Sequence, residues 1–198
     1  MVEEDGRNRR TAVRATDRVL LAYKRISAER YEEIAKDYRE GISIYNQEGL
    51  KDVQMYIGAQ SALDRLQARD PDLAEFLKHL DNKINIIMRR IKGEKSLLDL
   101  LKLQKINLSA TGIAFYSFEE FKTDELVEVH LALLPDYTYL YFFAKVTHSD
   151  REGEHQGRQI FLVGTEFVLM TDEDREKLVQ HNFKQQRLAL RTRRQDEE

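Results

Sequence analysis

The sequence predicts an α+β protein: an antiparallel β-barrel that is interrupted after its first strand by a long helical (coiled-coil) insertion and that ends in a C-terminal helix. Three observations lead to this fold class. A short apolar segment near the N-terminus has the composition of a buried strand, a long stretch with helical periodicity follows it, and several strand-like segments come after that stretch. The later strands alone make a thin sheet, so we expect the first segment to join them in one barrel.

The pattern divides the chain into three parts. Residues 1–26 are predicted to form a basic arm and the first barrel strand, residues 27–102 a helical oligomerisation insert, and residues 103–198 the rest of the barrel with a C-terminal helix and tail. The first strand is expected over residues 19–26, which are apolar and contain a tyrosine. The arm is rich in arginine, although the formal net charge of the chain is only -3.

The insert shows the periodicity of three helices. Ser27 is suited to cap the first, in which apolar residues recur every three or four positions. A second helix is expected over about residues 50–66, with less regular spacing. The third begins at Pro71, because proline is favoured at the first helical position. It is expected to run to about Leu101, with an interruption near Gly93.

The third helix carries a heptad repeat, since its apolar residues alternate between spacings of four and three. These seam residues are Leu73, Leu77, Leu80, Ile84, Ile87 and Ile91. Isoleucine at a d position, as at Ile87, is unfavourable in parallel dimers and suits trimers and tetramers. We therefore expect a homo-oligomer, a tetramer held by a parallel coiled coil with the other two helices packed outside. The alternative is that the three helices pack only on one another.

From residue 105 onward the pattern is typical of short strands separated by compact turns. The expected strands cover residues 106–118, 126–134, 137–147 and 159–169, with turns at 122–124, 135–136 and 150–154. A last helix is expected to begin at Thr171 or Asp172 as its cap. Its candidates for closing one end of the barrel are Leu178, Val179 and Phe183. Residues 187–198 are expected to form a partly mobile tail.

The composition argues against an enzyme and against a metal site. The chain has no cysteine, which removes disulfides, thiol catalysis and cysteine-ligated zinc. No catalytic triad, phosphate-binding loop or paired-carboxylate signature is present, so we expect no catalysis, no metal and no cofactor. The histidines lack metal-ligand spacing and are expected at the surface: His79, His130, His148, His155 and His181.

The chain shows no sign of membrane insertion or export. Its N-terminus is acidic and polar, without the apolar segment of a signal peptide. No run approaches the roughly 18 apolar residues that a membrane-spanning helix needs. We expect a cytoplasmic protein with no membrane span.

An arginine motif precedes the first strand. Arg10 and Arg14 lie four residues apart, and Arg9 stands beside them. A guanidinium group pairs bidentately with phosphate oxygens or with O6 and N7 of guanine. The arm is therefore a candidate segment for contacts with phosphate or with guanine.

A second polar motif stands at a strand–turn–strand junction after the insert. It consists of Asn107, Ser109 and Gly112. Asparagine offers a donor and an acceptor, serine a small hydroxyl, and glycine lets the backbone approach a ligand closely. This set suits the edge of a base and contains no nucleophile–base pair.

The two motifs resemble the signatures of the PilZ family of cyclic di-GMP receptors, R-x-x-x-R in an N-terminal loop and [D/N]-x-S-x-x-G on a later strand. The resemblance covers about residues 1–26 and 103–190. It implies that Arg10 and Arg14 grip phosphates and guanine Hoogsteen edges while the second motif holds a guanine. The motifs lie far closer together in ordinary members, and the helical insertion here is similar to that of an atypical tetrameric branch.

The resemblance favours a non-catalytic receptor. Cyclic di-GMP would bind between the arm and the barrel, order the arm, and change a surface that an unidentified downstream protein reads. One alternative is an oligomeric PilZ-fold adaptor that binds no nucleotide. Another is a nucleic-acid binder that uses the arm and tail, but the negative net charge argues against it, and no specific nucleic-acid partner is expected.

Overall fold

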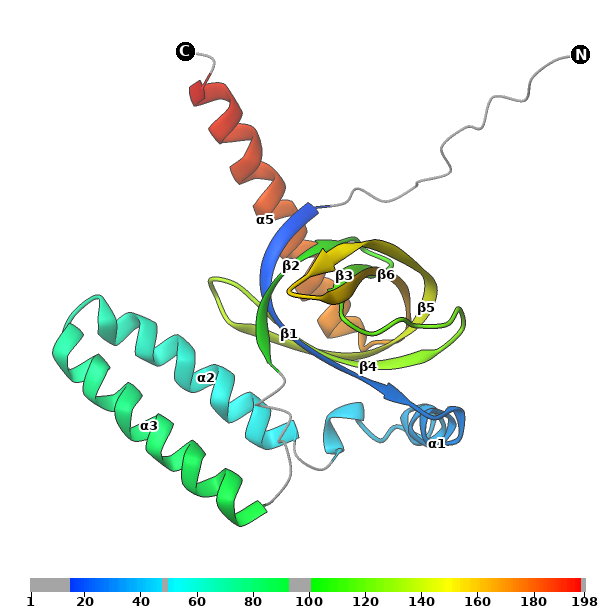
Figure 1. Cartoon of the computed structure of the whole chain (residues 1–198), viewed down its shortest axis with the longest axis horizontal. Helices are drawn as coiled ribbons and strands as arrows, with labels where there is room; N and C mark the ends of the chain where they lie inside the picture. The colour runs from blue at the N-terminus through cyan, green and yellow to red at the C-terminus, as the bar shows by residue number, and fades with distance from the viewer. Residues whose placement is uncertain (1–14, 48–49, 93–100, 197–198) are drawn as a thin grey trace, which may run out of the picture.

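Figure 1 shows the computed structural model of the chain, which describes residues 15–47, 50–92 and 101–196. Within these residues six strands form a closed antiparallel barrel in the order β1-β2-β3-β6-β5-β4. The strands are β1 Ala15–Ile26, β2 Lys102–Leu108, β3 Ile113–Ser117, β4 Leu126–Leu133, β5 Thr138–His155 and β6 Arg158–Leu169. The helices are α1 Ala28–Arg39, the 3-10 helix η1 Ile44–Asn46, α2 Leu50–Gln67, α3 Pro71–Lys92 and α5 Asp172–Asp196. The expected fold class is confirmed.

Strand β1 closes the barrel because it pairs with two neighbours. Residues 15–21 pair with β2, and residues 19–26 pair with β4. The strand begins at Ala15 rather than at Val19, where the apolar pattern starts. Its first residues are held by the β2 ladder and carry polar side chains, which give no hydrophobic signal of a strand.

The wall made by β4 is buried on both of its faces. Inward-facing side chains at every second position from Val127 to Leu133 belong to the barrel core. The residues between them, Glu128, His130 and Ala132, are buried as well. An outer strand face that excludes water needs a cover, and the insert provides it.

The first part of the insert forms this cover. Ile34 of α1 and Ile44 of η1 pack in one cluster with Tyr141 and Phe143 on the outside of β5. The beginning of α2 continues the cover over Ala132 of β4. The expectation that α1 packs outside a coiled coil is therefore wrong, because its apolar face is used by the aromatic side chains of the barrel wall.

Helices α2 and α3 form an antiparallel pair that extends away from the barrel (Figure 1). Ala74 is fully buried, and Lys78 Nζ donates to Gln67 Oε1 at 2.9 Å between the two helices. The structure describes α3 as far as Lys92. Residues 93–100, which include the expected interruption at Gly93, lie outside the described residues. Leu101 precedes β2 directly and is not helical, so the expected helix end at this residue is wrong.

The heptad seam of α3 faces solvent in the single chain. Its described side chains are 38% to 58% exposed: Leu73, Leu77, Leu80, Ile84 and Ile87. The side chain of Ile91 lies outside the described part. The alternative in which the insert helices bury this seam among themselves is therefore wrong for these five residues.

The β5–β6 hairpin is longer than the sequence indicates. A turn was expected at residues 150–154, but β5 continues to His155, which pairs with Arg158. The turn is formed by Gln156 and Gly157, both with positive φ, of 51° and 75°. Two such residues match the twist of a tight hairpin. Gly153 lies at a register shift within the ladder instead of in the turn.

Helix α5 seals one end of the barrel. Thr171 caps it as expected, because its hydroxyl accepts from the Asp174 backbone amide at 3.1 Å. Leu178 is fully buried in the barrel core, but Phe183 is 61% exposed, so its expected closing role is wrong. The helix projects from the barrel and continues to Asp196, although a tail was expected over residues 187–198 (Figure 1). No helix in the described ranges is long and apolar enough to cross a membrane.

A polar network lies under the cover formed by the insert. Glu128 contacts Lys24 Nζ at 3.0 Å and His130 Nε2 at 3.2 Å, and its Oε1 accepts from the Tyr141 hydroxyl at 3.1 Å. The second ring nitrogen of His130 lies 2.8 Å from the Tyr139 hydroxyl. Burial opposes ionisation of Glu128, but the contacts with His130 and Lys24 outweigh it and hold the pKa of this carboxyl below its usual range.

This lowered pKa predicts that Glu128 makes the fold sensitive to acid. A carboxyl with a lowered folded-state pKa contributes stability above its ordinary value of 4.5, and this contribution is lost as the pH falls through the folded-state pKa. We expect Glu128→Gln to reduce the loss in free energy of unfolding between pH 7 and pH 3. Urea titrations across that range measure it. Glu154→Gln, at an exposed hairpin position, is the control; equal pH slopes for wild type and Glu128→Gln would contradict the prediction.

Candidate functional site

The turn between β2 and β3 is organised by the hydroxyl of Ser109. This oxygen donates to Gly112 O at 3.0 Å and accepts from the backbone amides of Thr111 at 3.3 Å and Gly112 at 3.1 Å. The Ser109 amide also donates to Gly112 O at 3.0 Å. The serine of the second motif therefore holds its own turn together. The residue is buried, with 8% of its surface exposed.

Gly112 presses this turn against β6. A Cβ atom at this position would lie 1.9 Å from Thr165 O, so no other residue fits without a backbone shift. Two hydrogen bonds on either side of Gly112 also join the turn to β6. Phe167 N donates to Thr111 O at 2.9 Å, and Thr165 Oγ1 donates to Ile113 O at 3.0 Å. The close approach expected of this glycine is filled by protein backbone.

Asn107 joins the second motif to the start of β1. Its Oδ1 accepts from Thr16 Oγ1 at 3.0 Å, and the two residues are register partners. The residue is half-buried at this position, with its side-chain oxygen turned to β1. Ala15, the residue before Thr16 and the first of β1, pairs with Leu108 directly before the turn.

The predicted arginines lie outside the described residues. Arg9, Arg10 and Arg14 belong to the segment 1–14, which is covalently joined to β1 at Ala15. The pairing of Ala15 with Leu108 brings the attachment point of the arm beside the second motif, across a sequence gap that spans the whole insert.

Helix α5 adds two contacts that the sequence did not indicate. Arg175 Nη1 donates to Ala110 O, inside the turn of the second motif, at 3.3 Å. Nε2 of His181 contacts Asp17 Oδ2 of β1, close to the attachment point of the arm. Neither contact could be found from a motif, because each joins residues far apart in the chain.

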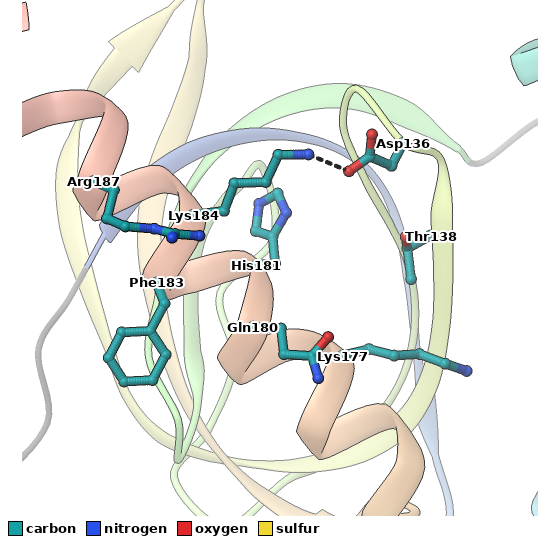
Figure 2. A pocket seen from close by; sticks show the side chains of 8 residues that line it. All are labelled: Asp136, Thr138, Lys177, Gln180, His181, Phe183, Lys184 and Arg187. Atoms are coloured by element: carbon teal, nitrogen blue, oxygen red, sulfur yellow. Dashed lines mark hydrogen bonds and ion pairs between the residues drawn. The ribbon is translucent and has the colours of Figure 1, made fainter. Parts of the chain in front are cut away.

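A hollow of about 480 Å³ lies between α5 and the turn that joins β4 to β5. Figure 2 shows His181 in its centre and Lys184 reaching across to Asp136, with a nitrogen–oxygen distance of 2.6 Å. Lys177 also lines it and is paired with Glu173, whose carboxylate helps to raise the pKa of this lysine despite partial burial. Two of its cations are thus already neutralised by neighbouring acids.

The groups around the β2–β3 turn can form hydrogen bonds and charge interactions. They are the exposed side chain of Thr111, the amide of Asn107 and the exposed guanidinium of Arg175. Within the described ranges, no group of three histidine, aspartate or glutamate side chains could hold a metal ion. His130 and His181 are buried, which corrects the expectation that all the histidines lie at the surface.

Comparison with known proteins identifies the class of this barrel. The family model for the PilZ domain matches residues 88–184, from the end of α3 into α5. The chain therefore contains a PilZ domain in this region. Strand β1 precedes the matched region and is assigned to the barrel by its pairing with β2 and β4.

One solved structure with similarity over most of the chain comes from Xanthomonas campestris. It is described as a tetrameric PilZ domain self-assembled via an unusual helical bundle; the identity is 15%, the match covers 91% of each chain, and the TM-score is 0.45. A likeness this distant does not transfer the assembly to the present chain. A search of curated proteins gave no match.

The packing of Gly112 predicts that a single methyl group disturbs the turn. We expect Gly112→Ala to lower the free energy of unfolding by about 1–3 kcal/mol, the usual cost of overpacking, because the new Cβ meets Thr165 O. Gly153→Ala is the matched control, since a Cβ there meets nothing within 4 Å. Urea denaturation of the three proteins measures the difference, and equal midpoints for the two variants would contradict the assignment.

Proposed function

We propose that this chain is a cyclic di-GMP-binding second-messenger receptor that self-associates through its helical insert and signals by binding a downstream protein. The nucleotide lies between the arginine arm and the β2–β3 turn. Arg10 and Arg14, with Arg9 beside them, contact phosphates and guanine edges, and Asn107 offers its amide to a guanine. The role is non-catalytic, and the PilZ domain supports it.

One observation carries this proposal. The bond between Thr16 and Asn107, with the register that pairs Ala15 with Leu108, brings the end of the arm to the edge of the second motif. An arm attached at this point reaches the turn without any rearrangement of the barrel. The exposed turn residue Thr111 and the guanidinium of Arg175 face the same region.

The energy of such a site is sufficient for a signalling receptor. A hydrogen bond to a charged group contributes about 1.5–3 kcal/mol, and ordering of the arm opposes binding at about 1–2 kcal/mol per residue. Several guanidinium–phosphate and guanidinium–guanine bonds can offset the ordering of a short arm. A micromolar dissociation constant needs a net of about -8 kcal/mol.

The nucleotide assignment predicts that Arg14 is required for binding. We expect cyclic di-GMP to give saturable heat in a calorimetric titration at physiological salt, and Arg14→Ala to weaken the affinity tenfold or more because it removes charge-assisted bonds. Arg158→Ala is the control, since this arginine at the start of β6 lies 4.4 Å from the ring of Phe118, which follows the end of β3 opposite to the turn.

The outcomes separate the two candidate functions. Binding that is unchanged in Arg14→Ala would show that the site is wrongly placed. No binding by the wild type would favour the alternative, an oligomeric PilZ-fold adaptor that uses the barrel for protein contacts. That alternative has one observation in its favour: Ser109 and Gly112 already have structural roles in the turn, which a protein without ligand would also need.

The second part of the proposal is self-association through α3. The seam residues are exposed in one chain, and they stand on a helix that projects from the barrel (Figure 1). Burial of each leucine or isoleucine contributes about 1.5–3 kcal/mol. A second copy of the chain is the partner that fits, because the heptad repeat presents the same apolar surface on every copy. We propose a tetramer held by a parallel coiled coil.

A charge in the seam should therefore dissociate the oligomer. We expect Ile84→Lys to shift the molar mass in light scattering towards the monomer of 23.3 kDa while the circular dichroism spectrum stays helical, since Ile84 is 58% exposed in one chain. Phe183→Lys places the same charge at an exposed apolar position on α5 and should leave the mass unchanged. A wild-type protein that is monomeric at micromolar concentration would refute this part of the proposal.

A further inference from the structure

Tyr45 connects the insert to two parts of the barrel domain at once. Its hydroxyl donates to Asp174 Oδ2 of α5 at 2.5 Å and accepts from the backbone amide of Tyr141 in β5 at 3.1 Å. Its ring packs edge-on against Tyr139 and Tyr141, with centroids 6.1 Å and 5.8 Å away. Burial raises the pKa of Tyr45, and the Asp174 carboxylate raises it further, so the hydroxyl stays a donor.

Asp174 is a buried carboxylate that depends on this donor. Asp174 is 1% exposed, and its carboxylate also contacts Lys177 Nζ at 3.4 Å. A buried carboxylate that loses a hydrogen bond pays the desolvation cost of the unpaired oxygen. The first turn of α5 is therefore held in place by the insert as well as by its Thr171 cap.

The next residue along the helix reaches the second motif. Arg175 donates to Ala110 O at 3.3 Å, between Ser109 and Gly112. Asp174 and Arg175 are adjacent in the first turn of α5, so a shift of this turn also moves the backbone from which Arg175 reaches Ala110 O. The series of contacts thus runs from Tyr45 in η1 through Asp174 and Arg175 in α5 to Ala110 in the β2–β3 turn.

We propose that the helical insert positions the nucleotide motif, with Tyr45 and Arg175 as positioning residues that act through Asp174 on the turn 109–112. Loss of either contact loosens the turn, although neither residue belongs to a PilZ signature. The reverse also holds, because coupling between two sites is reciprocal. Ligand at the turn thereby influences how η1 is held on the barrel. The biological meaning rests on the proposed function, but the mechanical link does not.

Hydrogen–deuterium exchange measures this link without any ligand. The amides of Ser109, Thr111 and Gly112 are bonded within the turn. We expect Tyr45→Phe to accelerate exchange in a peptide covering residues 106–115 about tenfold, while strand β4 keeps its wild-type rate. The ring remains in place, so packing is retained and only the hydroxyl is removed.

Tyr137→Phe is the matched control. Tyr137 OH donates to Asp64 Oδ2 at 2.6 Å, so it also joins the barrel to the insert by a tyrosine–aspartate bond, but it does not reach α5. Its removal should leave exchange at 106–115 within twofold of wild type. Equal acceleration by the two variants, or acceleration of the whole barrel, would overturn the proposal in favour of general destabilisation.

Substitutions of Arg175 test the last contact in this series, the one with Ala110, and leave the buried Tyr45–Asp174 pair unchanged. Arg175→Ala should accelerate the same peptide, and Arg175→Lys should restore protection, because an ammonium group can donate to Ala110 O. The double variant Tyr45→Phe/Arg175→Ala should exchange no faster than Arg175→Ala, as expected of residues that act in series. Additive acceleration, or no change in Arg175→Ala, would show that the link does not exist.

Titration with cyclic di-GMP keeps this proposal distinct from the proposed function. If the wild type binds, Tyr45→Phe should weaken the affinity several-fold and Tyr137→Phe should not. If the wild type does not bind, the receptor assignment fails while the exchange results still decide the positioning role. Wild-type affinity in Tyr45→Phe together with wild-type exchange at 106–115 would refute it.

Discussion

Strand β1 must hydrogen-bond to β2 and to β4 at the same time, and the rest of the structure depends on this double pairing. Residues 15–21 complete one ladder and residues 19–26 the other, so the barrel closes only when both are formed. The chain then leaves β1 beside Leu126 of β4 and returns at Lys102 beside Leu21. The insert is thereby placed over the outer wall of β4 and β5, and the arm is placed beside the second motif. Two features far apart in the sequence follow from one constraint on backbone pairing.

The insert consequently has two parts, one packed on the barrel and one projecting from it. Its first part, α1, η1 and the beginning of α2, excludes water from a strand face that carries Glu128, His130 and Tyr141. Polar groups buried there cost free energy unless they are paired, and the Lys24–Glu128–His130–Tyr139 contacts satisfy most of them. Its second part, the α2–α3 pair, leaves the barrel with an apolar seam exposed (Figure 1). The first part therefore covers the barrel wall, whereas the second part leaves its apolar seam available for the self-association proposed above.

Helix α5 stands between these parts and the candidate site. It closes the barrel with Leu178, receives the Tyr45 hydroxyl from the insert at Asp174, and reaches the second motif with Arg175. The motif itself has an internal function, since Ser109 and Gly112 fold the turn and press it against β6. Thr111 remains exposed in this turn, and Asn107 beside it is half-buried. A short signature sequence thus combines the folding of a turn with the display of a few polar groups.

The sequence by itself determined the features that repeat locally: the strands by alternation, the seam of α3 by its heptads, the Thr171 cap, and the PilZ domain by two motifs. The lack of metal-ligand spacing suggested that all the histidines lie at the surface, and a glycine with acidic neighbours suggested a turn at 150–154; His130 and the long hairpin show that both expectations were wrong. Only the tertiary structure decided that the insert covers Glu128 and His130 and that the hairpin turns at Gln156 and Gly157. It alone joined Tyr45 to Asp174 and Arg175 to Ala110. The physical reason is range: periodicity records contacts between residues a few positions apart, whereas barrel closure brings together residues whose separation leaves no local pattern.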